Sequence, residues 1–201
     1  MIRLKQLLVA VAVFSSATAS AGQIGIGDFS GGETVTSFDN LGLGFTTATP
    51  LVFDGNTYTT DDGILRYTDP NGFDADCNGE CIGNDSDLGW IDVVLGGTFD
   101  RVGARVGGAS TSYNGLVDFF GVGDVLLGSV AFGNNAGMVF TGWEDFGGIT
   151  RVRFNDTASN GLILHLDDFR FESDRVPEPG SLAMLGLGLA GLVVARRRKA
   201  A

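Results

Sequence analysis

The sequence predicts an all-β domain, an antiparallel two-sheet sandwich of jelly-roll type, between an N-terminal signal peptide and a C-terminal single transmembrane helix. Short apolar or alternating runs recur from about Ile24 to Glu172, separated by Gly, Asn and Asp, and none has a convincing helical period. An apolar content of 44% with 15 Phe argues against a disordered chain despite the 32 Gly. One folded domain is therefore expected over residues 22–175.

The strands are expected where apolar and polar residues alternate. A first hairpin pairs Leu51–Phe53 with Thr57–Thr59, because Gly55 and Asn56 tolerate the positive φ angles of a tight turn. A further strand is expected at 64–68, and residues 69–89 are predicted to form one long loop. Seven more runs follow: Trp90–Leu95, Phe99–Val106, Leu116–Phe120, Val125–Phe132, Met138–Trp143, Ile149–Phe154 and Leu162–Phe171.

Side-chain alternation predicts which residues face the core. In the last run the apolar positions change parity between Leu166 and Phe169, which predicts a β-bulge near Asp167. The residues expected to point inward are Ile91, Val93, Leu95, Val102, Ala104, Val106, Val152 and Phe154.

Residues 1–21 have the features of a secretory signal peptide. Arg3 and Lys5 precede a short apolar run, and Ala19-Ser20-Ala21 fits the cleavage site of signal peptidase. The run is too short to span a hydrocarbon core of about 30 Å. Transfer by the secretion machinery and a mature chain beginning near Gly22 are therefore expected.

The charge balance excludes nucleic acid as a partner. Between Lys5 and Arg196 the chain has seven basic and 24 acidic side chains, a net charge of −17. Such a domain repels phosphates instead of releasing their counterions.

The only two cysteines, Cys77 and Cys81, lie in an acidic segment with C-x3-C spacing. In an oxidising exported compartment this spacing predicts a local disulfide. A zinc site is not expected, because His165 is the only histidine and lies far along the sequence.

The same segment has the residue pattern of a calcium loop, with oxygen-bearing side chains at positions 1, 3, 5, 7 and 12 and Gly at position 6. Two features depart from the pattern, since Cys81 takes the eighth position and no flanking helices are evident. A solvated acidic turn pinned by the disulfide is the alternative to a Ca²⁺ site. The candidate ligands are Asp74, Asp76, Asn78, Glu80 and Asp85.

Residues 176–201 differ abruptly in composition from the domain. Pro177, Glu178 and Pro179 follow the final strand, and an apolar stretch then runs from 181 to 195. As a helix this stretch is about 22 Å long, short for a bilayer and suited to a temporary anchor. A basic stop-transfer cluster holds the extreme end in the cytoplasm, and it consists of Arg196, Arg197, Arg198 and Lys199.

In this order, the Pro-Glu-Pro motif, the Gly-rich apolar stretch and the basic cluster resemble the PEP-CTERM sorting signal of Gram-negative bacteria. The resemblance implies recognition by an exosortase, a membrane-embedded cysteine peptidase, and passage from an inner-membrane-anchored precursor to the cell surface or medium. It also implies an association with exopolysaccharide and biofilm matrix. The closing strand, Leu166–Phe171, resembles that of the small β-sandwiches often found ahead of this tag. An ordinary single-span anchor is the alternative, but it leaves the Pro-Glu-Pro motif unexplained.

These features favour a non-enzymatic surface or extracellular-matrix protein. His165 beside Asp167 and Asp168 suggests a catalytic dyad, but without a nucleophile motif a histidine among sheet residues is the better interpretation. A calcium-assisted carbohydrate-binding module is the alternative function. A glycoside hydrolase is less favoured, because any acidic sandwich offers chance carboxylate pairs. A sugar-stacking platform, weighed against a core role, would use Trp90, Trp143, Tyr58, Tyr67 and Tyr113.

Overall fold

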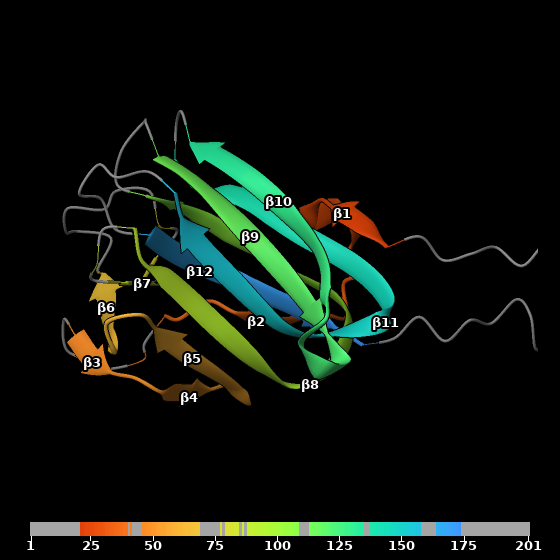
Figure 1. The fold of residues 1–201 in the computed structure, drawn as a ribbon, viewed down its shortest axis with the longest axis horizontal. Coiled ribbons are helices and arrows are strands. Elements are labelled where there is room, and N and C mark those ends of the chain that lie inside the picture. The colour runs from red at the N-terminus through yellow and green to blue at the C-terminus, as the bar shows by residue number, and fades with distance from the viewer. Residues whose placement is uncertain are drawn as a thin grey trace, which may run out of the picture.

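The computed structural model describes residues 21–39, 41, 46–68, 77, 79–84, 86, 88–108, 113–134, 137–157 and 164–173. Within them the regular structure is strand, apart from two single-turn 3-10 helices (Figure 1). The first half of the chain contains β1 (Gly22–Ile24), η1 (Ile26–Asp28), β2 (Thr34–Thr36), β3 (Thr46–Ala48), β4 (Leu51–Phe53), β5 (Asn56–Thr60), β6 (Ile64–Thr68) and β7 (Cys81–Asn84). The second half contains β8 (Trp90–Gly108), β9 (Tyr113–Gly121), η2 (Val122–Asp124), β10 (Leu126–Asn134), β11 (Val139–Asp156) and β12 (Leu164–Glu172).

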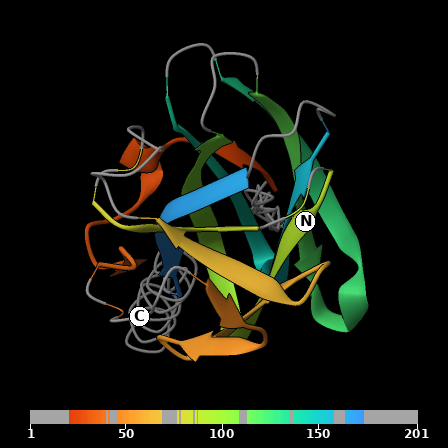
Figure 2. The same ribbon diagram turned by 90° about the vertical axis from the view of Figure 1, so that its left-hand side faces the viewer.

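The strands form two antiparallel layers that share β8 and β11. The N-terminal half of β8 and the C-terminal half of β11 pair with each other, with β5 on one side and β9 on the other; β4 and β10 lie outside these. The remaining halves of β8 and β11 pair in a second layer with β1 and β12, and β2, β7, β6 and β3 extend it beyond β12. Figure 2 shows the layers from the end that carries β3 and β6.

The all-β, antiparallel prediction is confirmed, but the predicted division into short strands needs correction. Runs 90–95 and 99–106 belong to the single strand β8, and runs 138–143 and 149–154 to β11. Both strands pass from one layer to the other where their register shifts. In β11 the shift lies between Glu144 and Ile149, whose partners in β8 are Arg101 and Phe99. Ile149 pairs with Phe99 within the bend, and pairing of β8 with β11 resumes on both sides of it, so the two layers form one folded sheet.

The apolar residues of the two inner faces make one core. All eight positions predicted to point inward are buried, Leu95 being 7% exposed and the other seven fully buried. Phe169 of β12 packs edge-on against Tyr58 of β5 and Phe154 of β11, which joins the two layers through aromatic contacts.

Other predictions are resolved by the strand pairing. The β4–β5 hairpin has the expected register, with Leu51 opposite Tyr58. The bulge near Asp167 is confirmed, because the register shifts between Asp167 and Arg170 and Asp168 has a φ of 46°. The predicted long loop at 69–89 is wrong in one part, because β7 lies within it and buries Ile82 between β6 and β12.

Among the described residues, no helix is long and apolar enough to cross a membrane. Apart from Ala21, the predicted signal peptide lies outside these residues, as do the transmembrane stretch at 181–195 and the sorting motif.

Candidate functional site

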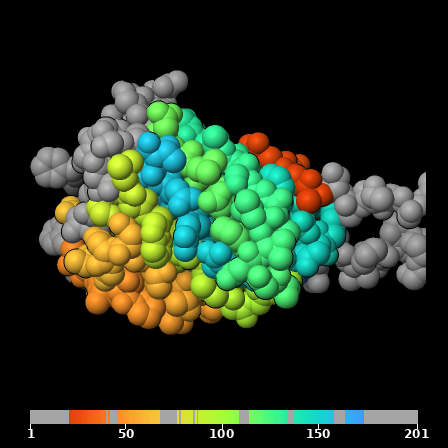
Figure 3. Space-filling model, in the orientation of Figure 1, coloured from red at the N-terminus to blue at the C-terminus, as the bar shows by residue number. Residues whose placement is uncertain are grey.

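The outward face of the first layer carries an ordered array of polar and aromatic side chains. Val152 and Phe154 of β11 point into the core, so alternation points Arg151, Arg153 and Asn155 outward. The neighbouring strands can be followed side by side across the visible face in Figure 3. The register places three rows across them: Phe120, Arg151, Val94 and Thr57; Ser129, Asp118, Arg153, Asp92 and Thr59; and Ala131, Leu116, Asn155 and Trp90.

Two arginines of β11 join the aromatic residues of this face to one carboxylate. Arg151 lies over the ring of Phe120, with its Cζ 3.7 Å from the ring centroid, and Arg153 lies over Trp90 at 4.6 Å. Both guanidinium groups donate to Asp92, at 3.1 Å from Arg151 and 2.7 Å from Arg153. The result is a continuous surface of stacked planar groups, which we call the aromatic–arginine face: Trp90, Arg153, Asp92, Arg151 and Phe120.

Further carboxylates beside this face pair with its arginine and polar side chains. Asp124 of η2 accepts from Nε of Arg151 at 2.9 Å. Asp118 accepts from the hydroxyl of Ser129 at 2.5 Å and from the side-chain amide of Asn155 at 2.9 Å. Each arginine is therefore paired with a carboxylate, and the face has no excess positive charge to attract a polyanion.

Trp90 is positioned by the segment that precedes it. Asp61 accepts the backbone N–H of Trp90 at 3.2 Å and the hydroxyl of Ser86 at 2.6 Å. A Cβ at Gly89 would lie 2.5 Å from Oδ1 of Asp61 and 2.1 Å from Oγ of Ser86, so glycine permits this close approach. The role of Asp61 could not be predicted from the sequence, because its partners lie 25 and 29 residues further along the chain.

The aromatic residues weighed as a platform do not gather on this face. Tyr58 is fully buried, and Trp143 stacks on the buried Phe119 with ring centroids 5.8 Å apart. Burial raises the pKa of Tyr58 far above its ordinary value. Tyr67 is half-buried and its hydroxyl donates to the carbonyl of Phe38. The side chain of Tyr113 lies outside the description, so Trp90 is the one predicted member found here; Phe120 was assigned only to a strand.

At the other end of the domain, the predicted disulfide joins Cys77 to Cys81. His165 is a fully buried residue of β12, as predicted, but it lies beside the disulfide. The two sulfurs and one of its ring nitrogens lie within 4.8 Å of one another. His165 is far from the cysteines in the sequence but close to them in space, because β12 and β7 are paired in the sheet.

Of the predicted calcium ligands, Asp74, Asp76, Asn78 and Asp85 lie outside the described residues. The backbone N–H of Glu80 donates to Asp39 at 2.9 Å, and the strand β7 begins at the next residue. The calcium loop stays a prediction.

A buried ion cluster lies where the domain leads into its C-terminal segment. Arg101 is 1% exposed and contacts Glu144 at 2.7 Å and Glu172 at 3.5 Å. The backbone N–H of Ser30 donates to Glu172 at 3.2 Å, and the Ser30 hydroxyl donates to the same carboxylate. Burial on its own raises the pKa of Glu172, but the hydrogen bonds from Ser30 and the charge of Arg101 outweigh it, so the pKa is lowered.

Comparison with known proteins identifies the C-terminal segment. A family model described as the PEP-CTERM protein-sorting motif matches residues 175–199, which include Pro177, Glu178, Pro179 and the basic cluster. No curated protein sequence matches the chain.

Among solved structures, the chain is similar to a family 29 carbohydrate-binding module, CBM29_1, from Piromyces equi. The two are 12% identical with a TM-score of 0.46, and the alignment covers 73% of this chain and 95% of that one. The K1 cleaved adhesin domain of Lys-gingipain from Porphyromonas gingivalis W83 is also similar, with 13% identity, a TM-score of 0.48 and coverages of 71% and 99%. The chain therefore carries a PEP-CTERM sorting motif behind an antiparallel β-domain, and this motif indicates an exported protein that an exosortase sorts at the cell envelope.

Proposed function

We propose that the protein is a non-enzymatic component of the cell surface or extracellular matrix, and that its aromatic–arginine face binds a neutral polysaccharide. The proposal deepens the predicted association with exopolysaccharide. Its main support is the strand register, which sets Trp90 and Phe120 at two ends of one polar surface.

The chemistry of the face suits a sugar chain. Trp90 pairs with Asn155 and Phe120 with Arg151, so their rows lie four residues, or about 13 Å, apart along β11. Aromatic surface can pack against the apolar C–H face of a sugar ring, and the guanidinium and amide groups between can hydrogen-bond its hydroxyls. A span of this length suits an oligosaccharide better than a single sugar.

A neutral ligand is favoured over an acidic one. Arg151 and Arg153 already bind Asp92, so a uronate or phosphate would have to displace a carboxylate to reach them. Asp118 and Asp124 add negative charge at the edge of the face. Binding should therefore depend little on salt.

Calorimetric titration of the full-length protein in mild detergent against neutral and acidic oligosaccharides tests the proposal. Trp90→Ala should weaken binding of a neutral glycan about tenfold, equivalent to about 1.4 kcal/mol. Phe146→Ala is the matched control, because Phe146 is an exposed aromatic residue of β11 outside this face. Flat titrations across the panel, or equal effects of the two variants, would remove the proposal. Repeating the titration with Ca²⁺ and with a chelator tests the calcium-assisted alternative.

The sorting route has its own test. We propose that signal peptidase removes residues 1–21, that the stretch 181–195 anchors the precursor in the inner membrane, and that an exosortase cuts near Pro177. Intact mass of the protein from the envelope and from the medium should show loss of both ends in the medium. A released protein that retains residues 176–201 would contradict this order of events. Efficient polysaccharide turnover by the purified protein would contradict the non-enzymatic assignment.

A further inference from the structure

The disulfide and its surroundings bring together four side chains that bind soft metal ions. Sγ of Cys77, Sγ of Cys81 and a ring nitrogen of His165 lie within 4.8 Å of one another, and all three residues are buried. Met138 packs with the two cysteines in a small buried cluster separate from the main core. We call these four residues the soft-ligand cluster.

The sheet fixes the histidine of this cluster. His165 is paired with Gly83 of β7 on one side and with Gly107 of β8 on the other, so its backbone is held between two strands. Cys81 is the first residue of β7 and is paired with Thr68 of β6. Gly79, at a φ of +111°, forms part of the turn between the two cysteines. If the disulfide were reduced, His165 and Cys81 would remain on paired strands. Only the turn that carries Cys77 would have to change conformation.

We propose that, once the disulfide is reduced, the soft-ligand cluster binds one monovalent copper ion. Cys77, Cys81 and His165 would be its ligands, and the thioether of Met138 would complete the set. Metal–sulfur bonds of about 2.3 Å and metal–nitrogen bonds of about 2.0 Å place neighbouring ligand atoms of a tetrahedral site roughly 3.5–4 Å apart. The ring nitrogen of His165 already lies within 4.8 Å of both sulfurs, and the two sulfurs would have to move apart after reduction to reach this spacing.

The ligand types favour Cu⁺ over harder ions. Thiolate and thioether sulfur select soft cations, whereas carboxylate and water oxygens select Ca²⁺ and Mg²⁺. Zn²⁺ also accepts two thiolates and an imidazole, but it gains little from a thioether. Met138 is therefore the residue whose replacement should distinguish Cu⁺ binding from Zn²⁺ binding.

Reduction of the Cys77–Cys81 disulfide requires a reductant, and we assign this role to a dithiol. The dithiol gives two electrons and two protons to the disulfide, which becomes the thiols of Cys77 and Cys81, and the dithiol itself becomes a cyclic disulfide. Binding of Cu⁺ then displaces the two thiol protons to solvent. The oxidised protein has no thiolate to offer, so the disulfide makes the site dependent on the redox state.

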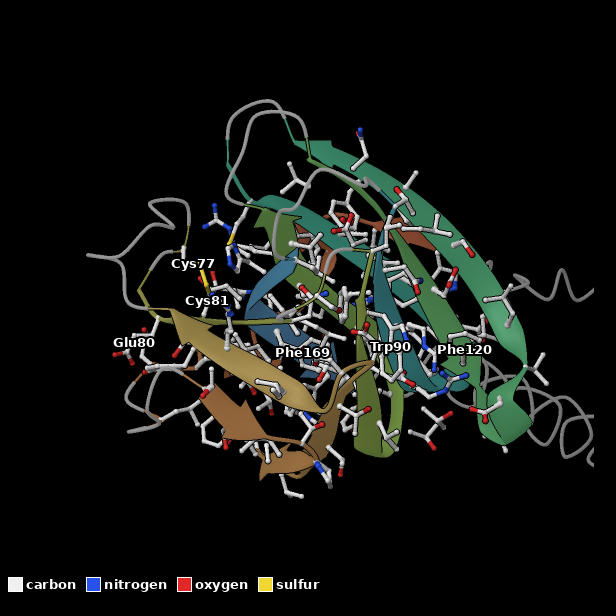
Figure 4. All side chains as sticks on the ribbon, turned by 60° about the vertical axis from the view of Figure 1, so that its left-hand side comes forward. Cys77, Glu80, Cys81, Trp90, Phe120 and Phe169 are labelled. Atoms are coloured by element: carbon white, nitrogen blue, oxygen red, sulfur yellow. A yellow bond between two sulfur atoms is a disulfide. The ribbon has the colours of Figure 1, made fainter. Side chains whose placement is uncertain are left out.

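The cluster lies at the end of the domain where β7 begins, and Figure 4 shows Cys77 and Cys81 there. His165 is near the start of β12 and Glu172 ends it, seven residues or about 23 Å further along the strand. A copper site here would be distant from the buried ion cluster at the other end of β12.

Competition against a chromogenic Cu⁺ chelator tests the proposal with the full-length protein, produced with its disulfide formed. The dithiol-reduced protein should remove one equivalent of Cu⁺ from the chelator, and the oxidised protein none. Met138→Leu should weaken Cu⁺ binding about tenfold, or about 1.4 kcal/mol, and leave Zn²⁺ binding unchanged. Cys81→Ser should abolish binding of both metals.

Ile82→Val is the matched control, since Ile82 is buried in β7 beside Cys81 but belongs to the main core. It should bind Cu⁺ as the unsubstituted protein does. A thermal unfolding scan provides a second readout, because Cu⁺ bound to the folded state should raise the midpoint of the reduced protein. Failure of the reduced protein to compete for Cu⁺ would overturn the proposal. Equal Cu⁺ affinity in Met138→Leu, or tighter binding of Zn²⁺ than of Cu⁺, would overturn the assignment to copper.

Discussion

The two ends of β12 are held by different kinds of interaction. Near its start, His165 lies against the Cys77–Cys81 disulfide, a covalent link that depends on redox state. At its end, Glu172 accepts hydrogen bonds from Ser30 and faces Arg101, an arrangement that depends on charge. One strand therefore carries a redox-sensitive end and a pH-sensitive end, and each should be open to disturbance without the other.

Removing the cation from the charged end should have the largest effect. Arg101→Met leaves Glu144 and Glu172 close together without their shared partner, and we expect a loss of about 3–5 kcal/mol of unfolding free energy. Urea denaturation followed by tryptophan fluorescence measures it.

Replacing all three charges is the control for that variant. Arg101→Met combined with Glu144→Gln and Glu172→Gln removes the uncompensated charge as well, so it should recover part of the lost stability. A triple variant no more stable than Arg101→Met would show that packing, and not charge, dominates this end.

Breaking the covalent end should cost less. The disulfide closes a loop of five residues, for which the chain-entropy relation gives about 2 kcal/mol. The measurement compares urea midpoints of the oxidised protein and of Cys77→Ser/Cys81→Ser. The difference should be the same with and without Glu172→Gln, because His165 and Glu172 lie seven residues apart along β12. A difference that changes when Glu172→Gln is added would mean that the two ends are coupled.

The smallest effect is the response of the charged end to acid. The folded state lowers the pKa of Glu172 from its ordinary value of 4.5, so its ionised form stabilises the fold above that value. This contribution is lost as pH falls through the lowered pKa. Glu172→Gln should therefore be less stable than the unsubstituted protein at pH 7 but lose less stability between about pH 5 and pH 3. Parallel stability curves for the two proteins would contradict the assigned shift.

Much of the core and of the strand pattern was predictable, because burial of one sheet face imposes alternation. Val93, Val102 and Phe154 follow this rule and are buried. The rule fails at Arg101, which alternates with Val102 yet is itself 1% exposed, because Glu144, Glu172 and the segment around Ser30 close over it. The burial of Arg101 depends on pairing between strands that are distant in the sequence. This pairing cannot be inferred from the spacing of residues within one strand.

In the candidate sites too, contacts between neighbours in the sequence were predictable and contacts between distant strands were not. The C-x3-C disulfide was predictable because its partners are four residues apart. The meeting of Cys81 with His165 was not, since they are 84 residues apart in the sequence and come together only because β7 pairs with β12. Trp90 and Phe120 likewise share a face through β11, which lies between their strands.

The place of β12 in the sheet also affects the order in which the exported chain can fold. β12 is the last described strand in the sequence, yet it lies between β8 on one side and β7 and β2 on the other. A chain that has emerged only as far as residue 163 therefore has exposed strand edges where the centre of the second layer should be. The second layer therefore cannot be completed until residues 164–172 are available, shortly before the sorting motif at 175–199 in the sequence.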